Sequence, residues 1–183
     1  MPFRARKKPE PLNEAALYEY AVNALGRRMR TVAELTRLMR NRVERGERGQ
    51  AKIDSVTARL KEYGYVNDAD YAANYAKLRQ ENSSFGKRRV RQDLAVKGVK
   101  AEVIASTLDA AYEGVNEEEL ARKHLERKRV KKPATEKEAA RVMRMLVRAG
   151  FSSGVVYSIL KKWDVPDETL SALESVEDPP ADG

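Results

Sequence analysis

The chain has 183 residues, with 36 Lys and Arg against 28 Asp and Glu, a formal net charge of +8, and no cysteine. The absence of cysteine excludes disulfide bonds and cysteine-ligated zinc, and it is typical of a reducing cytoplasm. No apolar run approaches the roughly 18 residues of a membrane span, and no signal-peptide core follows the basic start. We therefore expect a soluble cytoplasmic protein with room for one medium domain or several small ones.

After a basic extension over residues 1–12, one short pattern occurs three times. The stretches LNEAAL, VNDADY and VNEEEL each place an Asn after an apolar residue and before acidic residues. An Asn side chain accepts hydrogen bonds from the free amides of a first helical turn, and acids there face the positive end of the helix dipole. Asn13, Asn67 and Asn116 therefore predict three helix starts. A divalent-metal site on Asp68 and Asp70 is the alternative, but acids in a first turn are far more often helix starters.

The residues after these starts also repeat. At a constant shift of 52 residues, Val90, Leu94, Gly98, Val99, Val103, Ile104 and Leu108 correspond to Val142, Leu146, Gly150, Phe151, Val155, Val156 and Leu160. Leu35, Met39, Val56 and Leu60 follow the same pattern earlier in the chain. Met39 to Leu60 spans 21 residues where Leu94 to Leu108 spans 14, so this copy carries 7 extra residues. They lie within RVERGERGQ, which we predict to be a longer loop.

Boundary signals agree with three units over 13–66, 67–115 and 116–165, each with three short helices. Thr31 with Glu34, and Thr135 with Glu138, have the spacing of capping boxes at second-helix starts. Glycines stand where helices are expected to end, at Gly26, Gly64, Gly98 and Gly150.

The first helix of the middle unit is expected to bury Tyr71, Tyr75 and Leu78, which share one helical face. No segment shows a sustained strand alternation. The predicted fold class is therefore all-α, with three tandem three-helix repeats.

The net charge is unevenly divided among these segments. It is +4 over 13–66, +1 over 67–115 and +6 over 116–165, whereas 166–183 has six acidic residues and no basic one. A basic array with an acidic end predicts a polyanionic partner, and a disordered tail able to compete with that partner.

Basic residues gather near equivalent points of the three units. The candidate contact residues are Lys87, Arg88, Arg89, Arg91 and Lys97 as first choice, then Arg27, Arg28, Arg30, Arg37 and Arg40, and then Arg127, Lys128, Arg129, Lys131 and Lys132. Stacked units would align these clusters into a stripe that tracks phosphates. The alternative is an ordinary solvated helical surface.

The tyrosines and the single histidine are two further groups of candidate functional side chains. The tyrosines have faces on which bases stack, but Tyr63, Tyr71 and Tyr75 follow core spacing, which favours burial. His124 is the only histidine, and its place on a first-helix stripe favours a structural role over a general base. No Ser/His/Asp set, P-loop, Gly-x-Gly fingerprint or His/Cys cluster is present. We therefore expect no enzyme activity, no cofactor and no metal.

The central block GYVNDADYAANYAKLRQENSSFGKRRVRQDLAVKGVKAEVI resembles the RecX family of bacterial regulatory proteins. The matching positions are Gly64, Tyr65, Val66, Asp68, Tyr71, Phe85, Gly86, Arg89, Val90, Arg91, Leu94, Lys97, Gly98 and Val99. TVAELTRLM resembles the first unit of that family and RMLVRAGFSSGVVYSIL the last, so the resemblance covers roughly 13–163. The basic extension and the acidic tail depart from it.

This resemblance implies a curved, elongated array of three three-helix repeats that modulates the RecA recombinase in DNA repair, recombination and the SOS response. Such proteins lie in the groove of the RecA–single-stranded DNA filament and limit its ATPase activity and strand exchange. The implied partners are RecA and single-stranded DNA, with duplex DNA as a further candidate, bound without sequence preference by a monomer. Two alternatives remain, a stand-alone helical regulator that binds duplex DNA and a purely protein-binding scaffold.

Overall fold

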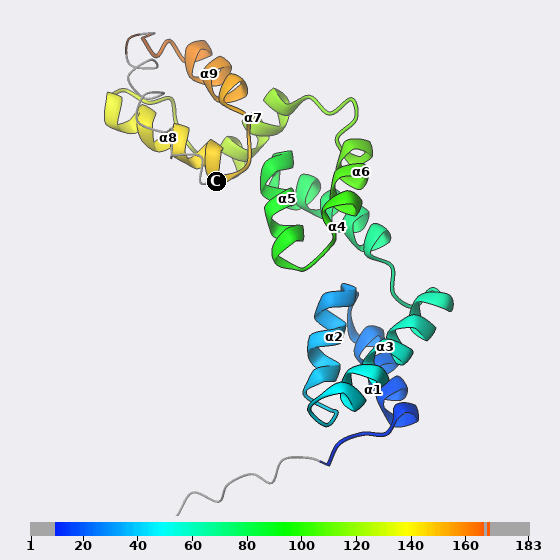
Figure 1. Cartoon of the computed structure of the whole chain (residues 1–183). Helices are drawn as coiled ribbons and strands as arrows, with labels where there is room; N and C mark the ends of the chain where they lie inside the picture. Colours follow the sequence, from blue (N-terminus) through cyan, green and yellow to red (C-terminus); the bar gives the residue numbers. More distant parts are fainter. Residues whose placement is uncertain (1–9, 167, 169–183) are drawn as a thin grey trace, which may run out of the picture. The chain divides into compact units, whose positions relative to one another are not determined.

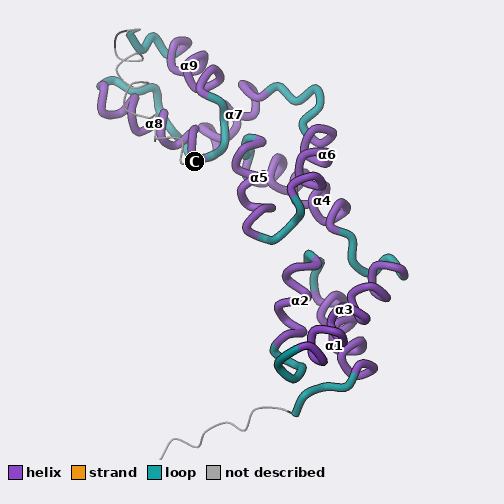
Figure 2. Tube along the Cα trace, in the orientation of Figure 1, coloured by secondary structure: helices purple, strands orange, loops and turns teal. Residues whose placement is uncertain are grey.

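The computed structural model describes residues 10–166 and 168, and in this part of the chain the regular elements are nine α-helices without a strand (Figure 1). Figure 2 shows the helices joined by short loops. The predicted all-α class is confirmed. Most of the basic extension and of the acidic tail lies outside the described residues. No helix among the described residues is long and apolar enough to cross a membrane.

The helices fall into three successive sets of three. They are α1 (Glu14–Arg27), α2 (Val32–Arg40) and α3 (Glu47–Glu62), then α4 (Asp68–Ser83), α5 (Lys87–Val96) and α6 (Ala101–Ala111), then α7 (Glu117–Arg127), α8 (Glu136–Arg148) and α9 (Ser153–Lys162). By their contacts the described residues form two compact units. Unit 1 contains those up to Ala72 together with Leu94–Ile104, and unit 2 contains Ala73–Asp93 and those from Ala105 onward. The middle helices thus contribute to both units, and the proposed domain boundaries stay a prediction.

The three predicted helix starts are confirmed by hydrogen bonds. Asn13 Oδ1 accepts from the Ala16 amide at 2.9 Å, and Asn116 Oδ1 accepts from the Glu119 amide at 3.1 Å. Asn67 Oδ1 accepts from the amide of Ala69 at 2.9 Å. Each bond satisfies an amide that has no partner within its own helix.

In both predicted capping boxes, the hydroxyl of the cap residue accepts a hydrogen bond from the backbone amide three residues later. Thr31 Oγ1 accepts from the Glu34 amide at 3.1 Å, and Thr135 Oγ1 accepts from the Glu138 amide at 3.3 Å. The Glu138 carboxylate in turn accepts from the Ala134 amide at 2.7 Å. These bonds place the starts of α2 and α8 where the sequence predicted them.

Three of the four expected glycine stops are confirmed. Gly64, Gly98 and Gly150 have φ of 71°, 79° and 90°, the left-handed conformation in which a Cβ is disfavoured. Gly26 is the exception, because it lies inside the last turn of α1 and the chain leaves that helix through Arg28 in an extended conformation, with φ of −166°. An extended residue needs no glycine, so the prediction for Gly26 was wrong.

The seven extra residues of the first repeat mostly lengthen a helix, and the predicted longer loop accounts for few of them. The loop 41–46 is only two residues longer than 97–100, whereas α3 has 16 residues against 11 in α6. A Cβ at Gly49 would lie 1.9 Å from the carbonyl oxygen of Glu44, so the start of α3 closes tightly over this loop.

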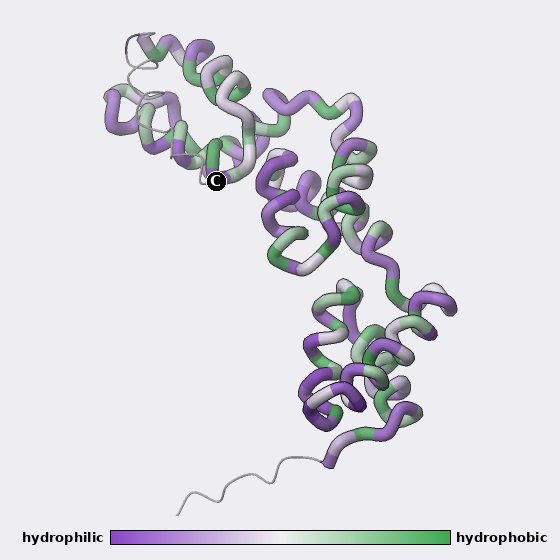
Figure 3. The backbone as a smooth tube through the Cα atoms, in the orientation of Figure 1, coloured by the Kyte–Doolittle hydropathy of each residue, from purple (hydrophilic) through white to green (hydrophobic). Residues whose placement is uncertain are grey.

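The core of unit 1 forms where α1, α2 and α3 meet. Its fully buried side chains include Leu17, Leu35, Met39, Ile53 and Leu60. Figure 3 shows hydrophobic and hydrophilic residues alternating along the helices, the pattern of helices buried on one face only.

The core stripe of α4 differs from its prediction. Tyr71 is buried, but Tyr75 is only half-buried, and Leu78 is 54% exposed. Ala72 and Ala76 are fully buried and take the inward positions. The buried stripe is therefore rotated toward small residues, which allows α4 to pack closely on its neighbours.

In unit 2, close backbone contact joins the start of α5 to the end of α8. The Gly86 amide donates to the Ala149 carbonyl at 2.8 Å, and a Cβ on Gly150 would lie 2.2 Å from the Arg89 amide nitrogen. His124 is 3% exposed nearby, with its ring centroid 5.9 Å from that of Phe85. Its Nδ1 lies 2.9 Å from the carbonyl oxygen of Ser83. A carbonyl can only accept, so Nδ1 donates, and this bond holds the buried ring in place.

Candidate nucleic-acid interface

The preferred predicted contact residues lie on α5 and just after it, at Lys87, Arg88, Arg89, Arg91 and Lys97, and are called the α5 cluster. Two of these cations are paired with neighbouring carboxylates. Lys87 Nζ lies 2.6 Å from Asp109 Oδ1 of α6, and this bond holds the pKa of Asp109 below its usual range. Arg89 Nε lies 3.0 Å from Asp93 Oδ1, an ion pair without hydrogen-bond geometry. Lys87 is half-buried, because packing of α6 brings a carboxylate to its ammonium group.

Lys97 is the third cation of the α5 cluster that is paired with a carboxylate. Its Nζ lies 3.3 Å from Glu34 Oε1 and 5.8 Å from the centre of the Tyr71 ring, all within unit 1. Burial by itself lowers the pKa of Lys97, but the Tyr71 hydroxyl and the Glu34 carboxylate outweigh it and raise this pKa. The Thr31 hydroxyl also donates to the Lys97 carbonyl at 2.7 Å. Lys97 therefore ties the end of α5 to the start of α2.

Arg88 and Arg91 are the members of the α5 group that remain exposed. Within the described part of the chain, neither forms an ion pair. The available charge of this cluster is thus smaller than its composition indicates.

The predicted cluster from Arg27 to Arg40 lies in unit 1 and is mostly exposed. Arg27, Arg28, Arg37 and Arg40 are exposed, whereas Arg30 is half-buried and its Nε donates to the Ala24 carbonyl at 3.2 Å. Arg30 therefore closes the end of α1, and the other four are available to a partner.

The third predicted cluster surrounds a hollow in unit 2. The loop between α7 and α8 and the first turns of α8 line a cleft of about 500 Å³, whose residues include Lys128, Arg129, Lys131, Lys132 and Arg141. Val130, Pro133, Val142 and Met145 contribute an apolar part to its wall.

Two members of this third cluster have partners elsewhere in unit 2. Lys132 Nζ lies 2.6 Å from Asp164 Oδ2, and Arg127 donates to the Glu81 carbonyl at 2.9 Å. The cations at 128, 129 and 131 are exposed. This cluster therefore keeps most of its charge.

A fourth basic surface was missed by the sequence interpretation. Lys137, Arg141, Arg144 and Arg148 of α8 are all exposed. Their spacing of 4, 3 and 4 residues places them on one helical face. That periodicity is visible in the sequence, but the four cations are separated by other residues and form no dense basic run.

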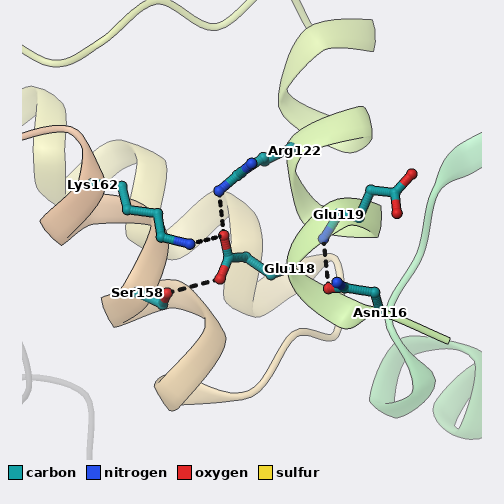
Figure 4. A network of polar contacts seen from close by, with 6 residues as sticks. All are labelled: Asn116, Glu118, Glu119, Arg122, Ser158 and Lys162. Atoms are coloured by element: carbon teal, nitrogen blue, oxygen red, sulfur yellow. Dashed lines mark hydrogen bonds and ion pairs between the residues drawn. The ribbon is translucent and has the colours of Figure 1, made fainter. Parts of the chain in front are cut away.

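Helix α7 shows the opposite arrangement, in which acids neutralise the cations (Figure 4). Glu118 receives hydrogen bonds from Lys162, Ser158 and Arg122, which together hold its pKa below the usual range, with Lys162 contributing most. Glu119 Oε1 pairs with Lys123 at 2.7 Å. The basic residues of α7 therefore stabilise the protein internally.

The exposed tyrosines correct another prediction. Tyr63 is 59% exposed and Tyr65 is 53% exposed, although core spacing favoured burial of Tyr63. Tyr63 lies at the end of α3, where the turn through Gly64 directs the chain away from the core. Arg59 stacks between Tyr18 and Tyr63, with its guanidinium carbon 4.3 and 5.7 Å from the two ring centres.

The two acids considered as metal ligands accept hydrogen bonds at helix starts. Asp68 Oδ1 accepts from the Val32 amide at 2.8 Å and so caps α2 from the start of α4, and Asp70 accepts from the Asn67 side chain at 2.8 Å. Among the described residues, no group of three or more His, Cys, Asp or Glu is placed to hold a metal ion.

The structure therefore divides the predicted contact residues between the two compact units. Unit 2 contains Lys87, Arg88, Arg89 and Arg91 together with the cluster from Arg127 to Lys132, whereas unit 1 contains Lys97 and the cluster from Arg27 to Arg40, and the alignment of all three clusters stays a prediction. These features define a class of protein, a tandem three-helix repeat array with exposed arginine surfaces. A family model of the second three-helix domain of RecX matches residues 67–108, and a model of the third matches 116–160. The chain belongs to the RecX family.

Individual relatives support this assignment. The chain is 34% identical to the regulatory protein RecX of Myxococcus xanthus over 171 residues, covering 86% of this chain and 90% of the relative. It is 32% identical to the regulatory protein RecX of Mycobacterium marinum over 157 residues, covering 82% of this chain and 86% of the relative. The crystal structure of RecX from Lactobacillus salivarius is similar with a TM-score of 0.65 and 20% identity, over 82% of this chain and 96% of that one, and supports the fold.

Proposed function

We propose that this chain is a non-enzymatic regulator that binds RecA and the RecA–single-stranded DNA filament and limits the filament's ATPase activity and strand exchange. The observation that carries this proposal is the similarity to proteins named regulatory protein RecX, which extends over 86% of the chain in the Myxococcus relative. The central block that resembles the family contains Asp68, Lys97 and Gly98, which join α2 to the middle repeat within unit 1. The family pattern at these positions therefore has a structural basis in this chain.

The distribution of exposed charge supports a filament as the partner. Both compact units present exposed arginines, Arg37 and Arg40 in one and Arg88, Arg144 and Arg148 in the other. A filament offers repeated phosphates and repeated protein faces, so several modest contacts made by one molecule combine as avidity. Contacts of this kind depend on salt and tolerate many DNA sequences.

The test is an assay of RecA ATPase activity on single-stranded DNA with this protein added in increasing amounts. Substoichiometric protein is expected to lower the rate, because one molecule that bridges protomers affects more than one active site. An unchanged rate at equimolar protein, with filaments intact by electron microscopy, would contradict the proposal. Sequence-specific binding to a duplex without any effect on RecA would instead indicate a stand-alone DNA-binding regulator.

A further inference from the structure

Helix α8 carries a continuous basic face on the side opposite to its core face. At 100° per residue, Lys137, Arg141, Arg144 and Arg148 fall within about 60° of one another and extend roughly 16 Å along the helix. Ala139, Val142, Met143 and Leu146 are buried on the other side. The orientation of the basic face is therefore set by the core packing of α8, and all four cations point to solvent.

No carboxylate neutralises this face within the described part of the chain. Arg122 and Lys123 of α7 pair with acids one helical turn earlier, whereas the four α8 cations have one another as neighbours three or four residues away. Like charges at these spacings destabilise a helix. Glu138 stands three residues before Arg141, but its carboxylate accepts from the Ala134 amide. Helix α8 thus keeps an arrangement that is unfavourable unless an external anion lies against it.

The basic face continues into the cleft at the start of α8. Arg141 belongs to both, since it stands on the helical face and lines the cleft together with Lys128, Arg129 and Lys131. One basic surface therefore leads from the loop 128–132 along the length of α8.

We infer that this surface, Lys137, Arg141, Arg144 and Arg148 with the loop 128–132, binds the sugar–phosphate backbone of a single nucleic-acid strand. Arginine predominates on the helix, and a guanidinium group contacts phosphate oxygens in a bidentate manner. A linear row of cations matches a linear row of phosphates. Helix α8 has no aromatic residue of the kind that anchors a protein–protein interface, and Val147, which is 41% exposed, borders the basic face. The inference deepens the proposed function, because it assigns the DNA component of the filament to this face.

The experiment compares two double variants of the full chain that remove the same charge. Arg141→Gln/Arg144→Gln changes the α8 face, and Arg122→Gln/Lys123→Gln changes paired cations of the neighbouring helix. Binding of each protein to a fluorescent single-stranded oligonucleotide is measured by anisotropy over a series of KCl concentrations. Circular dichroism and thermal melting confirm that both variants are folded.

The α8 variant is expected to bind less tightly, and its plot of log affinity against log salt should be shallower than the wild-type plot by roughly 1.4, since each lost contact with a single strand contributes about 0.7. The α7 variant should keep the wild-type slope. Equal weakening by both variants would overturn the inference, because net charge alone would then explain the binding. Absence of salt-dependent binding by the wild type would overturn it as well.

The RecA assay separates the inference from the proposed function. If the α8 variant binds DNA as the wild type does but no longer lowers RecA ATPase activity, the face contacts protein and the inference is wrong, while the regulatory function stands. If the wild type leaves RecA unaffected but the α8 variant alone loses DNA affinity, the inference stands and the proposed function is wrong.

Discussion

Helices α5 and α8 are the second helices of successive repeats, and both carry several cations, yet they present their charge differently. In α5, Lys87 and Arg89 are paired with Asp109 and Asp93. In α8, the four cations of the basic face have no ion-pair partner among the described residues. The comparison shows that the charge a helix offers to a partner depends on where the acids lie as much as on how many cations it contains.

The position of acids along each helix explains this difference. Asp93 stands four residues after Arg89 on α5, and α6 brings Asp109 alongside Lys87. In α8 the acids, Glu136 and Glu138, are confined to the first turn, where they face the positive end of the helix dipole. Acidic residues therefore neutralise cations in the middle repeat, whereas in the last repeat they stabilise the start of a helix.

The largest expected effect is a loss of stability from changes on the buried sides of α5 and α8. The comparison predicts that these two buried sides contribute equally to stability. Leu94→Ala in α5 and Leu146→Ala in α8 each remove a fully buried side chain. Both are expected to lower the free energy of unfolding by about 2–5 kcal/mol, because a cavity remains. Denaturant unfolding measures this loss. A loss below about 1 kcal/mol in only one of them would show that the repeats do not share a packing scheme.

The second largest effect is the loss of stability expected when the glycine that follows α8 is replaced. Gly150→Ala is expected to destabilise the protein by more than the roughly 1–2 kcal/mol of left-handed backbone strain, because a Cβ there would lie 2.2 Å from the Arg89 amide nitrogen of α5. Gly64→Ala is the matched control, with similar φ and nothing within 4 Å of its Cβ. Thermal melting of both variants gives the difference. Equal destabilisation would mean that the contact between the end of α8 and the start of α5 yields easily.

Charge reversal of exposed arginines tests the comparison directly. Arg144→Glu/Arg148→Glu on α8 is expected to lower affinity for single-stranded DNA by at least about tenfold at moderate salt, because each change removes an attraction and adds a repulsion. Arg88→Glu/Arg91→Glu on α5 should lower it less, since fewer neighbouring cations share the contact. Anisotropy titration measures both. A larger effect on α5 would restore that helix as the main contact surface.

The smallest effect is a change in the pKa of Asp109, the α6 carboxylate that pairs with Lys87 of α5. The hydrogen bond from Lys87 lowers the pKa of Asp109 below its usual 3.8, so this pair stabilises the fold at neutral pH and is lost as pH falls through the lowered value. In Lys87→Gln the pKa of Asp109 should return toward 3.8 in an NMR titration of its carboxyl group. Saturation of the wild type with DNA should leave this pKa lowered. A rise on DNA binding would mean that Lys87 leaves Asp109 for a phosphate.

The sequence by itself determined the local features of the fold. Asn13, Asn67 and Asn116 cap helices because their partners lie two or three residues away, and Gly64, Gly98 and Gly150 end helices or turns through their own φ. The constant shift of 52 residues also located buried pairs such as Leu94 and Leu146. These predictions succeeded because caps, turns and helical periodicity depend on short-range geometry.

The tertiary structure alone decided which cations are available. Lys87 meets Asp109 across 22 residues of chain and Lys97 meets Glu34 across 63, and neither pairing follows from a local pattern. Exposure of Tyr63 and Leu78 likewise depends on how far the neighbouring helices extend over them. The basic face of α8 combines both kinds of information. The spacing of its cations is visible in the sequence, but only the packed structure shows that no carboxylate of the described residues pairs with them. Pairing of charges is a property of distance in space, and helix packing sets that distance.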